Sequence, residues 1–290
     1  MTYGSQPRTG INFRIILAVL IGIGGLIAYL GKRSVNPVTG ETQYVAMTPK
    51  QEIALGLQSA PQMASQMGGD TPLSNPRAAF VSEVGQHIVH DSEAGKPQSP
   101  YAHNFQFHLL NDEQTINAFA LPGGQIFITL GLYEKLQNEA QLAGVLGHET
   151  GHVINRHAAE HMAKSQLGGM LAAAVGVGAS GTDQNGRSHG YSAAIIAQVV
   201  NNMAQLKFSR KDESEADAYG LKYMAQAGYD PQEMLGVMEI LKQASAGGRQ
   251  PEFLQTHPLP ETRLTEIAAK LKEMYPNGIP SNLTKGRPLP

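Results

Sequence analysis

Residues 138–154 read NEAQLAGVLGHETGHVI, and most of what the sequence predicts starts from this stretch. Asn138, followed three residues later by Gln141, has the pattern of a helix-capping box. No proline interrupts the chain from Glu139 to about Gln166, which predicts one long helix. The residues on either side of HETGH are mostly apolar, as a helix that runs through a hydrophobic core requires.

The five residues HETGH carry the chemistry of this predicted helix. His148 and His152 are four residues apart, so their side chains lie about 40° apart around the helix axis and can bind one zinc ion. Glu149 follows the first histidine and can take a proton from a water molecule on that ion without binding the metal itself. The pattern predicts hydrolysis of peptide bonds, with Glu149 as the catalytic base and one Zn²⁺ per chain.

The third metal ligand has to come from elsewhere. The sequence contains no cysteine, so the plausible donors are a distant histidine, aspartate or glutamate. One acidic cluster follows, made of Asp212, Glu213, Glu215 and Asp217. On a helix Glu213 and Asp217 share a face, whereas Glu215 points about 160° from Glu213. Either Glu213 or Asp217 can therefore bind the metal while the other orients a histidine. The alternative is that the acidic cluster is simply a solvated face of the helix.

Two further histidines, His157 and His161, follow the pentapeptide. On an unbroken helix they point roughly 180° away from His148 and His152, so they are not expected to bind the metal. A metzincin would carry a third histidine at the position of Ala158, which excludes that class.

The remaining sequence predicts a mainly helical α+β fold with a small, largely antiparallel sheet. Alternating apolar residues predict strands over Phe105–Leu110, Thr115–Ala120 and Gln125–Leu130. Helices are expected from the capping box at Thr48, over Arg77–Ser92, from Ser209 to Gly228, from Asp230-Pro231 and from Pro260. Pro61 is expected to interrupt the first of these, and the Gly/Ala-rich segment 167–200 to form a helical hairpin.

The N-terminal part contains an uncharged apolar segment, Ile15–Leu30, of adequate length for one transmembrane helix. An uncleaved anchor is favoured over a cleaved signal peptide or a buried core helix. The predicted organisation is a tail over 1–14, an anchor over 15–31, a linker over 32–47, a zinc metallopeptidase domain over 48–275 and a Pro-containing tail over 276–290. Positive charges flank the segment on both sides, and we favour an orientation with the catalytic domain outside.

The charge balance of the chain indicates which classes of binding partner to expect. Lys plus Arg total 22 against 24 for Asp plus Glu, so the chain lacks the basic excess that nucleic-acid backbones require. Nucleic acid is therefore not expected as a partner, and extended polypeptides and a membrane are.

HETGH together with SRKDESEAD at 209–217 resembles the HtpX-like and CAAX-prenyl-protease-like zinc metallopeptidases, which combine HExxH with a later E-x-x-A-D. The resemblance runs from about Thr48 to Leu271. It implies that Glu213 is the third zinc ligand and that Asp217 supports a ligand histidine from behind.

Two more segments are similar to this family. The family's counterpart of Asn117, Ala118, Phe119 and Ala120 is an edge strand near the cleft, where an extended peptide can bind by backbone pairing. An ordinary core strand is the alternative reading of these residues. His257-Pro258 with Arg263 resembles a later HPxxxxR motif, which implies that His257 binds zinc in a resting state or stabilises the oxyanion. Arg263 alternatively anchors the loop or binds substrate.

The resemblance implies a membrane-anchored zinc endopeptidase of the zincin type that acts on misfolded or envelope proteins in membrane protein quality control. Its catalytic domain is expected to be periplasmic or otherwise extracytoplasmic in a bacterium. A catalytically latent chaperone or assembly factor, which uses the same cleft only for binding, is the main alternative. A closed structural zinc site would need His257 as a permanent fourth ligand. The sequence makes no prediction of oligomeric state.

Overall fold

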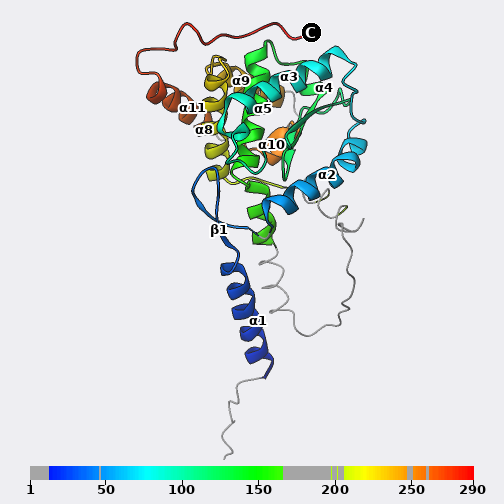
Figure 1. Ribbon diagram of the computed structural model, residues 1–290, viewed down its shortest axis with the longest axis vertical. Coiled ribbons are helices and arrows are strands. Elements are labelled where there is room, and N and C mark those ends of the chain that lie inside the picture. Colours follow the sequence, from blue (N-terminus) through cyan, green and yellow to red (C-terminus); the bar gives the residue numbers. More distant parts are fainter. Residues whose placement is uncertain are drawn as a thin grey trace, which may run out of the picture.

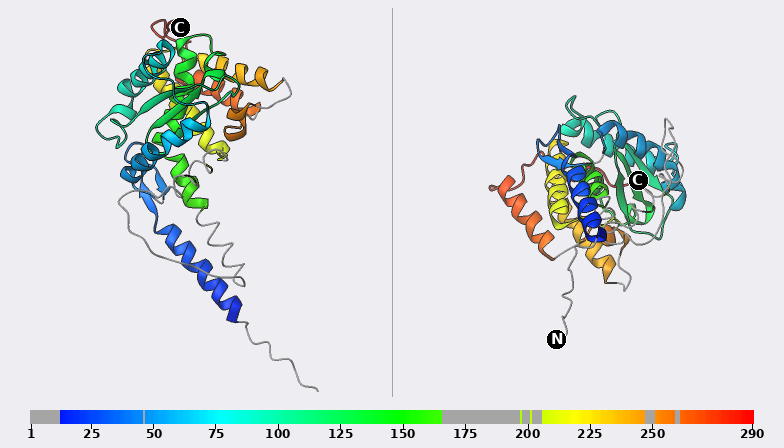
Figure 2. Two further views of the ribbon diagram at one scale, coloured as in Figure 1. Left: turned by 90° about the vertical axis from the view of Figure 1, so that its right-hand side faces the viewer. Right: turned by 90° about the horizontal axis from the view of Figure 1, so that it is seen from below.

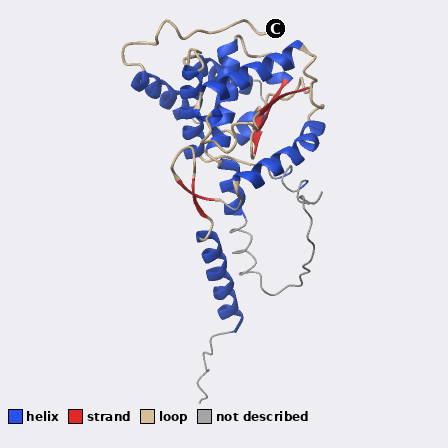
Figure 3. Cartoon of the chain, viewed as in Figure 1, coloured by secondary structure: helices blue, strands red, loops and turns tan. Residues whose placement is uncertain are grey.

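The computed structural model describes residues 13–45, 47–165, 197, 201, 206–246, 251–258 and 261–290. The described chain is mainly helical with a small sheet, which confirms the predicted α+β class (Figure 3). The longer helices are α1 Phe13–Leu30, α2 Pro49–Gln66, α3 Pro76–Asp91, α5 Glu139–Ile154, α8 Arg210–Gln226, α9 Glu233–Ser245 and α11 Glu261–Met274. Shorter ones are η1 Glu93–Gly95, α4 Leu130–Tyr133 and α10 Glu252–Thr256. The expected hairpin over 167–200 falls, apart from residue 197, outside the described residues.

Helix α5 lies at the centre of the fold (Figure 1). All of its residues are buried, and it packs against α3, α8, α9 and strand β4. Asn138 caps its first turn by accepting a hydrogen bond from the Gln141 amide, as the sequence predicts. The predicted ligands His148 and His152 are thus buried within the packed core around α5.

The sheet has three strands, β3 Gln106–Leu110, β4 Ala118–Leu121 and β5 Gln125–Thr129, in the order β3-β5-β4. Strand β4 pairs antiparallel with β5, but β3 and β5 are parallel, so the expected largely antiparallel sheet is only half right. The chain leaves β3, forms β4 at the far edge and then returns between the two, which gives β5 the direction of β3. Strand β4 is an edge strand, as expected.

Two expected helix boundaries are wrong. Helix α2 continues through Pro61, because the face formed by residues such as Ala60 and Met63 is buried and its packing outweighs the lost hydrogen bond. The predicted long helix from Glu139 breaks after α5, at Arg156, and a separate helical segment runs over 157–165.

The break at Arg156 has a tertiary cause. Its backbone adopts φ 58°, a left-handed conformation that costs a non-glycine residue about 1–2 kcal/mol. The buried guanidinium forms an ion pair with Glu52 of α2 and donates a hydrogen bond to the Met47 carbonyl. Glu52 also accepts a 2.6 Å hydrogen bond from the hydroxyl of Tyr101. This buried network fixes the turn that local sequence alone would not form.

The segment 32–47, expected to be a linker, forms an antiparallel hairpin of β1 Arg33–Val35 and β2 Thr42–Tyr44. The hairpin is docked on the end of α5, because the buried Asn36 side chain donates a 2.7 Å hydrogen bond to the Ile154 carbonyl. The C-terminal segment also packs on α5: the amide of Glu139 donates to the Arg287 carbonyl at 2.9 Å.

Helix α1 projects from the rest of the described chain, at the end opposite the C-terminus (Figures 1 and 2). Its large exposed apolar residues are Ile16, Val19, Leu20, Ile23, Leu26, Ile27 and Leu30. In the part of the chain that the structure describes, no helix meets the length and apolarity needed to cross a membrane. The transmembrane anchor stays a prediction.

Candidate metal centre

Helices α5 and α8 approach closely because two glycines lie between them. A Cβ on Gly151 would come within 3.0 Å of the Ala216 carbonyl oxygen, and one on Gly220 within 3.1 Å of the His148 amide nitrogen. This close contact brings the histidines of HETGH next to the acidic cluster at the start of α8. Helix α8 begins after Ser209, as predicted, and Ser209 forms a capping box with Asp212 there.

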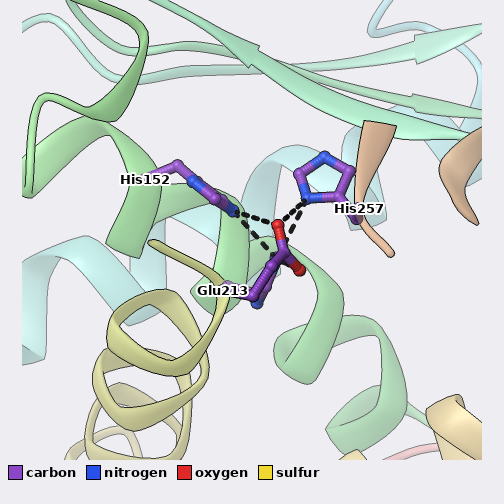
Figure 4. A group of neighbouring side chains, drawn as sticks. His152, Glu213 and His257 are labelled. Carbon is purple, nitrogen blue, oxygen red and sulfur yellow. Dashed lines mark hydrogen bonds and ion pairs between the residues drawn. The ribbon is translucent and has the colours of Figure 1, made fainter. Parts of the chain in front are cut away.

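Four side chains meet at this contact: His148, His152, Glu213 and His257. One ligand atom from each lies within 4.8 Å of the others, and all four side chains are almost completely buried. The Nε2 atoms of His148 and His152 are 3.1 Å apart, and Glu213 Oε1 lies 3.5 Å from His152 Nε2. His257 Nδ1, from the loop after α10, lies 3.0 Å from the same oxygen (Figure 4). The geometry therefore brings together every residue expected to contact the metal.

The charges within this group are suited to cation binding. Burial lowers the pKa of His152 well below its ordinary value, so the ring is neutral at neutral pH. Burial alone would raise the pKa of Glu213, but the charges of His257 and Arg263 bring it well below the ordinary value. A neutral imidazole and an ionised carboxylate are the forms that bind a divalent metal.

Glu149 lies beside the four-residue group without joining it. It is 0% exposed, and neither of its carboxylate oxygens has a hydrogen-bond partner. Oε1 lies 3.7 Å from His257 Nε2, and burial raises the pKa of Glu149 above its ordinary value. Buried polar atoms are nearly always paired in folded proteins. The unpaired oxygens thus fit a site whose remaining partners come from ligands, and the donor set fits zinc or a similar metal.

A carboxylate supports His148 from behind. The Nδ1 atom of His148 is 2.9 Å from Asp217 Oδ1. Arg263 holds this carboxylate with hydrogen bonds of 2.8 Å from Nε and 2.7 Å from Nη2, and it also forms a 2.6 Å ion pair with Glu213. Arg263 is itself buried and donates to the Pro258 carbonyl, so it anchors the loop that carries His257.

A second histidine supports His152. The Nδ1 atoms of His152 and His157 are 2.8 Å apart, and His157 Nε2 lies 3.1 Å from Glu215 Oε2. The other oxygen of Glu215 forms an ion pair with Lys211. On an unbroken helix His157 would lie on the opposite side from His152, as expected from the sequence, but the break at Arg156 brings the two rings together. His157 contacts a candidate ligand rather than joining the group of four.

Two aromatic residues that carry no recognisable signal in the sequence cover the centre. The Phe208 ring lies 4.0 Å from the His152 ring, centroid to centroid. Phe253 of α10 stacks on His257 at 4.5 Å. Each is an ordinary apolar residue in the sequence, so only the fold shows its position.

The expected peptide-binding strand lies next to the centre. Ala118 and Ala120 of β4 point into the main core, and Phe119 stacks on Phe127 of β5 at 4.9 Å. Asn117 is buried just before the strand, at the sheet edge. The position at an edge agrees with the expectation, and peptide pairing there stays a prediction.

Several known proteins are similar in sequence to this chain. A model of peptidase family M48 matches residues 76–271. The beta-barrel assembly-enhancing protease of Escherichia coli (strain K12) is 32% identical over 231 residues, 77% of this chain and 46% of that protein. The mitochondrial metalloendopeptidase OMA1 of Schizosaccharomyces pombe is 29% identical over 274 residues, 94% of this chain and 76% of that protein. The chain thus spans about half the length of the bacterial relative and three quarters of the yeast one.

Proposed function

Because the chain belongs to peptidase family M48, we propose that it is a zinc-dependent endopeptidase with its active centre at the contact between α5 and α8. The observation that carries the proposal is the buried group of His148, His152, Glu213 and His257 beside the unpaired Glu149. In this proposal His148, His152 and Glu213 hold one zinc ion. Zinc bound there would acidify a water molecule and polarise the scissile carbonyl.

The chain's own residues supply the proton transfers and the orientation. Glu149 accepts a proton from the attacking water at a carboxylate oxygen and then passes it to the leaving amine. Burial raises its pKa above the ordinary value, which favours retention of the proton between the two steps. Asp217 and His157 fix the ring orientations of His148 and His152. An extended polypeptide pairs with the free edge of β4.

The loop after α10 has a gating role in this proposal. His257 lies within the metal-binding group, so it can occupy the coordination position that substrate or water needs. The centre is closed in this arrangement, since all of its residues are buried. Displacement of His257 from the metal would open the centre and leave His257 Nε2, which has no hydrogen-bond partner, free to stabilise the oxyanion. Arg263 keeps the loop anchored during this movement.

The proposal on location and substrates is supported by α1 and by the relatives. In this proposal the segment 15–30, which exposes large apolar residues such as Leu20 and Ile27, serves as a single N-terminal membrane anchor. Relatives named as a beta-barrel assembly-enhancing protease and as mitochondrial metalloendopeptidases suggest a role in membrane or envelope protein quality control. We place the catalytic domain on the extracytoplasmic side of a bacterial membrane, where it cleaves misfolded proteins.

The test compares the full-length wild-type protein with Glu149→Gln, with zinc content and casein cleavage measured on both. We expect each to hold one zinc ion and only the wild type to cleave, because glutamine cannot accept the proton. Glu266→Gln, an exposed glutamate of α11, is the matched control and should retain wild-type activity. Equal cleavage by wild type and Glu149→Gln would refute the assigned mechanism.

The closed centre also supports a second candidate, a latent chaperone or assembly factor that binds peptides in the same cleft. If zinc-loaded wild type and Glu149→Gln both bind unfolded casein and neither cleaves it, this candidate replaces the peptidase. Phe253→Ala, which removes the ring stacked on His257, separates the two: it should activate a gated peptidase and leave a chaperone inactive.

A further inference from the structure

A groove of about 240 Å³ lies beside the metal centre, and none of the four candidate metal ligands lines it. Its walls are the C-terminal part of α2, the segment 112–119 and α10. Thr256 in its wall directly precedes His257, so the groove reaches to within one residue of the centre.

The groove lies on the face of the β4 segment toward which a bound peptide would direct some of its side chains. Thr115, Asn117 and Phe119 all line it, and alternate residues along an extended segment share one face. A peptide paired with the edge of β4 would also direct alternate side chains to this face. The groove is therefore placed to receive one substrate side chain near the scissile bond.

The lining of the groove has a specific chemistry. Met63, Met67 and Phe119 form its apolar part, and Asp112 and Glu252 contribute two carboxylates. No lysine, arginine or histidine is among the described residues that line it. The groove thus combines an apolar wall with uncompensated negative charge, which complements an aliphatic stem that ends in a cation.

The two carboxylates differ in their contacts within the protein. Asp112 Oδ1 accepts 2.9 Å hydrogen bonds from the amides of Gln114 and Thr115, which fix the carboxylate in place. Partial burial raises the pKa of Asp112, but the hydrogen bond from the Thr115 hydroxyl to Oδ2, together with the two amide hydrogen bonds, brings it below the ordinary value. Glu252 has no hydrogen bond or ion pair with any residue within the described ranges.

Asn117 adds an independent observation. It is 4% exposed, and its Oδ1 has no hydrogen-bond partner. The backbone of Asn117 is already bonded to Thr129, so the free acceptor is the side-chain oxygen. An unpaired buried acceptor in a groove wall is expected to find a donor in a bound ligand.

We propose that this groove is a subsite for a lysine or arginine side chain of the polypeptide substrate. The aliphatic stem packs on Met63, Met67 and Phe119, the cationic group pairs with Asp112 and Glu252, and Asn117 Oδ1 accepts a hydrogen bond from the bound peptide. This inference rests on the proposed peptidase function and specifies which peptides that peptidase prefers.

The experiment uses full-length, zinc-loaded protein and a peptide chosen from the casein fragments that it produces. Each of the four positions on either side of the cleaved bond is varied between lysine and norleucine, which keeps the stem and lacks the charge. At one position we expect lysine to raise kcat/KM by about 5- to 10-fold, the size expected for two partly exposed charge pairs. Glu252→Gln should lower the rate for the lysine peptide and leave the norleucine peptide unchanged, whereas the control Glu266→Gln should change neither.

A charge reversal at Glu252 is a more specific test of the proposal. Glu252→Lys should transfer the preference at that position from lysine to glutamate, which a loss of folding could not produce. Equal kcat/KM for lysine and norleucine at all positions, or a lysine preference that survives in Glu252→Gln and Glu252→Lys, would overturn the proposal.

Failure of the peptidase function would be seen separately. If zinc-loaded wild type cleaves no peptide, the same lysine and norleucine peptides are labelled and their binding to Glu149→Gln is measured by fluorescence anisotropy. Tighter binding of the lysine peptide that is lost in Glu149→Gln/Glu252→Gln supports the groove even then. Equal binding of the two peptides refutes it.

Discussion

The two histidines of HETGH lie one helical turn apart, yet they are supported in different ways. His148 contacts a buried carboxylate, Asp217, which a buried arginine holds in place. His152 contacts a second imidazole, that of His157, and the carboxylate beyond it is part-exposed and paired with a solvent-exposed lysine. A carboxylate in direct contact increases the basicity of an imidazole more than a carboxylate reached through a second ring. We infer that His148 is the more firmly fixed of the two.

The largest effect is expected for substitution of Arg263, which holds the Asp217 carboxylate that contacts His148. In Arg263→Gln the buried carboxylates of Asp217 and Glu213 lose their shared cation, and the metal-free protein should lose about 3–5 kcal/mol of unfolding free energy. Urea denaturation of the full-length protein measures this. Arg77→Gln, which removes an exposed pair with Glu134, is the control and should cost less than about 1 kcal/mol. Similar losses in the two variants would contradict the importance of the buried pair.

The second largest effect is expected for substitution of Asp217. Asp217→Asn keeps an oxygen that can accept from His148 but removes the negative charge, so the zinc dissociation constant should rise by about 100-fold. Competition with a chromophoric chelator at neutral pH gives the constant. An increase below threefold would mean that the carboxylate acts only as a spacer.

His157 is expected to matter less. His157→Ala removes the acceptor for the His152 ring and should weaken zinc binding by about 10-fold, while His157→Gln, which can still accept, should recover part of the loss. His161→Ala is the matched control, because His161 contacts Asp212 and no candidate ligand. If His157→Ala equals or exceeds Asp217→Asn, the proposed order of the two supports is reversed.

The smallest effect is expected for substitution of Lys211, the exposed residue that pairs with Glu215. Lys211→Gln breaks the 2.8 Å ion pair with Glu215, whose lysine side chain is 74% exposed. Such pairs contribute less than about 1 kcal/mol, so zinc affinity should change by less than about threefold. A loss as large as that of His157→Ala would show that the whole chain of contacts to His152 acts as one unit.

Features that depend on short-range periodicity could be predicted. The spacing of His148 and His152, and of Glu213 and Asp217, placed each pair on one helix face, and both pairs meet at the α5–α8 contact. The capping patterns at Thr48 and Ser209 also correctly located helix starts. Helical geometry repeats every few residues, so such positions follow from local sequence.

The features that could not be predicted depend on partners distant in the chain. His157 lies beside His152 because Arg156 takes a left-handed conformation, and that turn is stabilised by Glu52, 104 residues earlier. Neither residue carries a local signal for a helix break, since arginine rarely adopts positive φ. The parallel pairing of β3 with β5 and the continuation of α2 through Pro61 likewise depend on packing.

Residue chemistry and helical spacing in the sequence predict His148 and His152 as ligands, Glu149 as the base and the helices that carry them, and the family resemblance adds Glu213 and His257. The orientation of each candidate ligand, the position of the loop with His257 and the groove beside β4 come from the tertiary structure. These depend on buried charges and side chains that meet across long stretches of chain, where the free energy comes from desolvated contacts that no local pattern encodes.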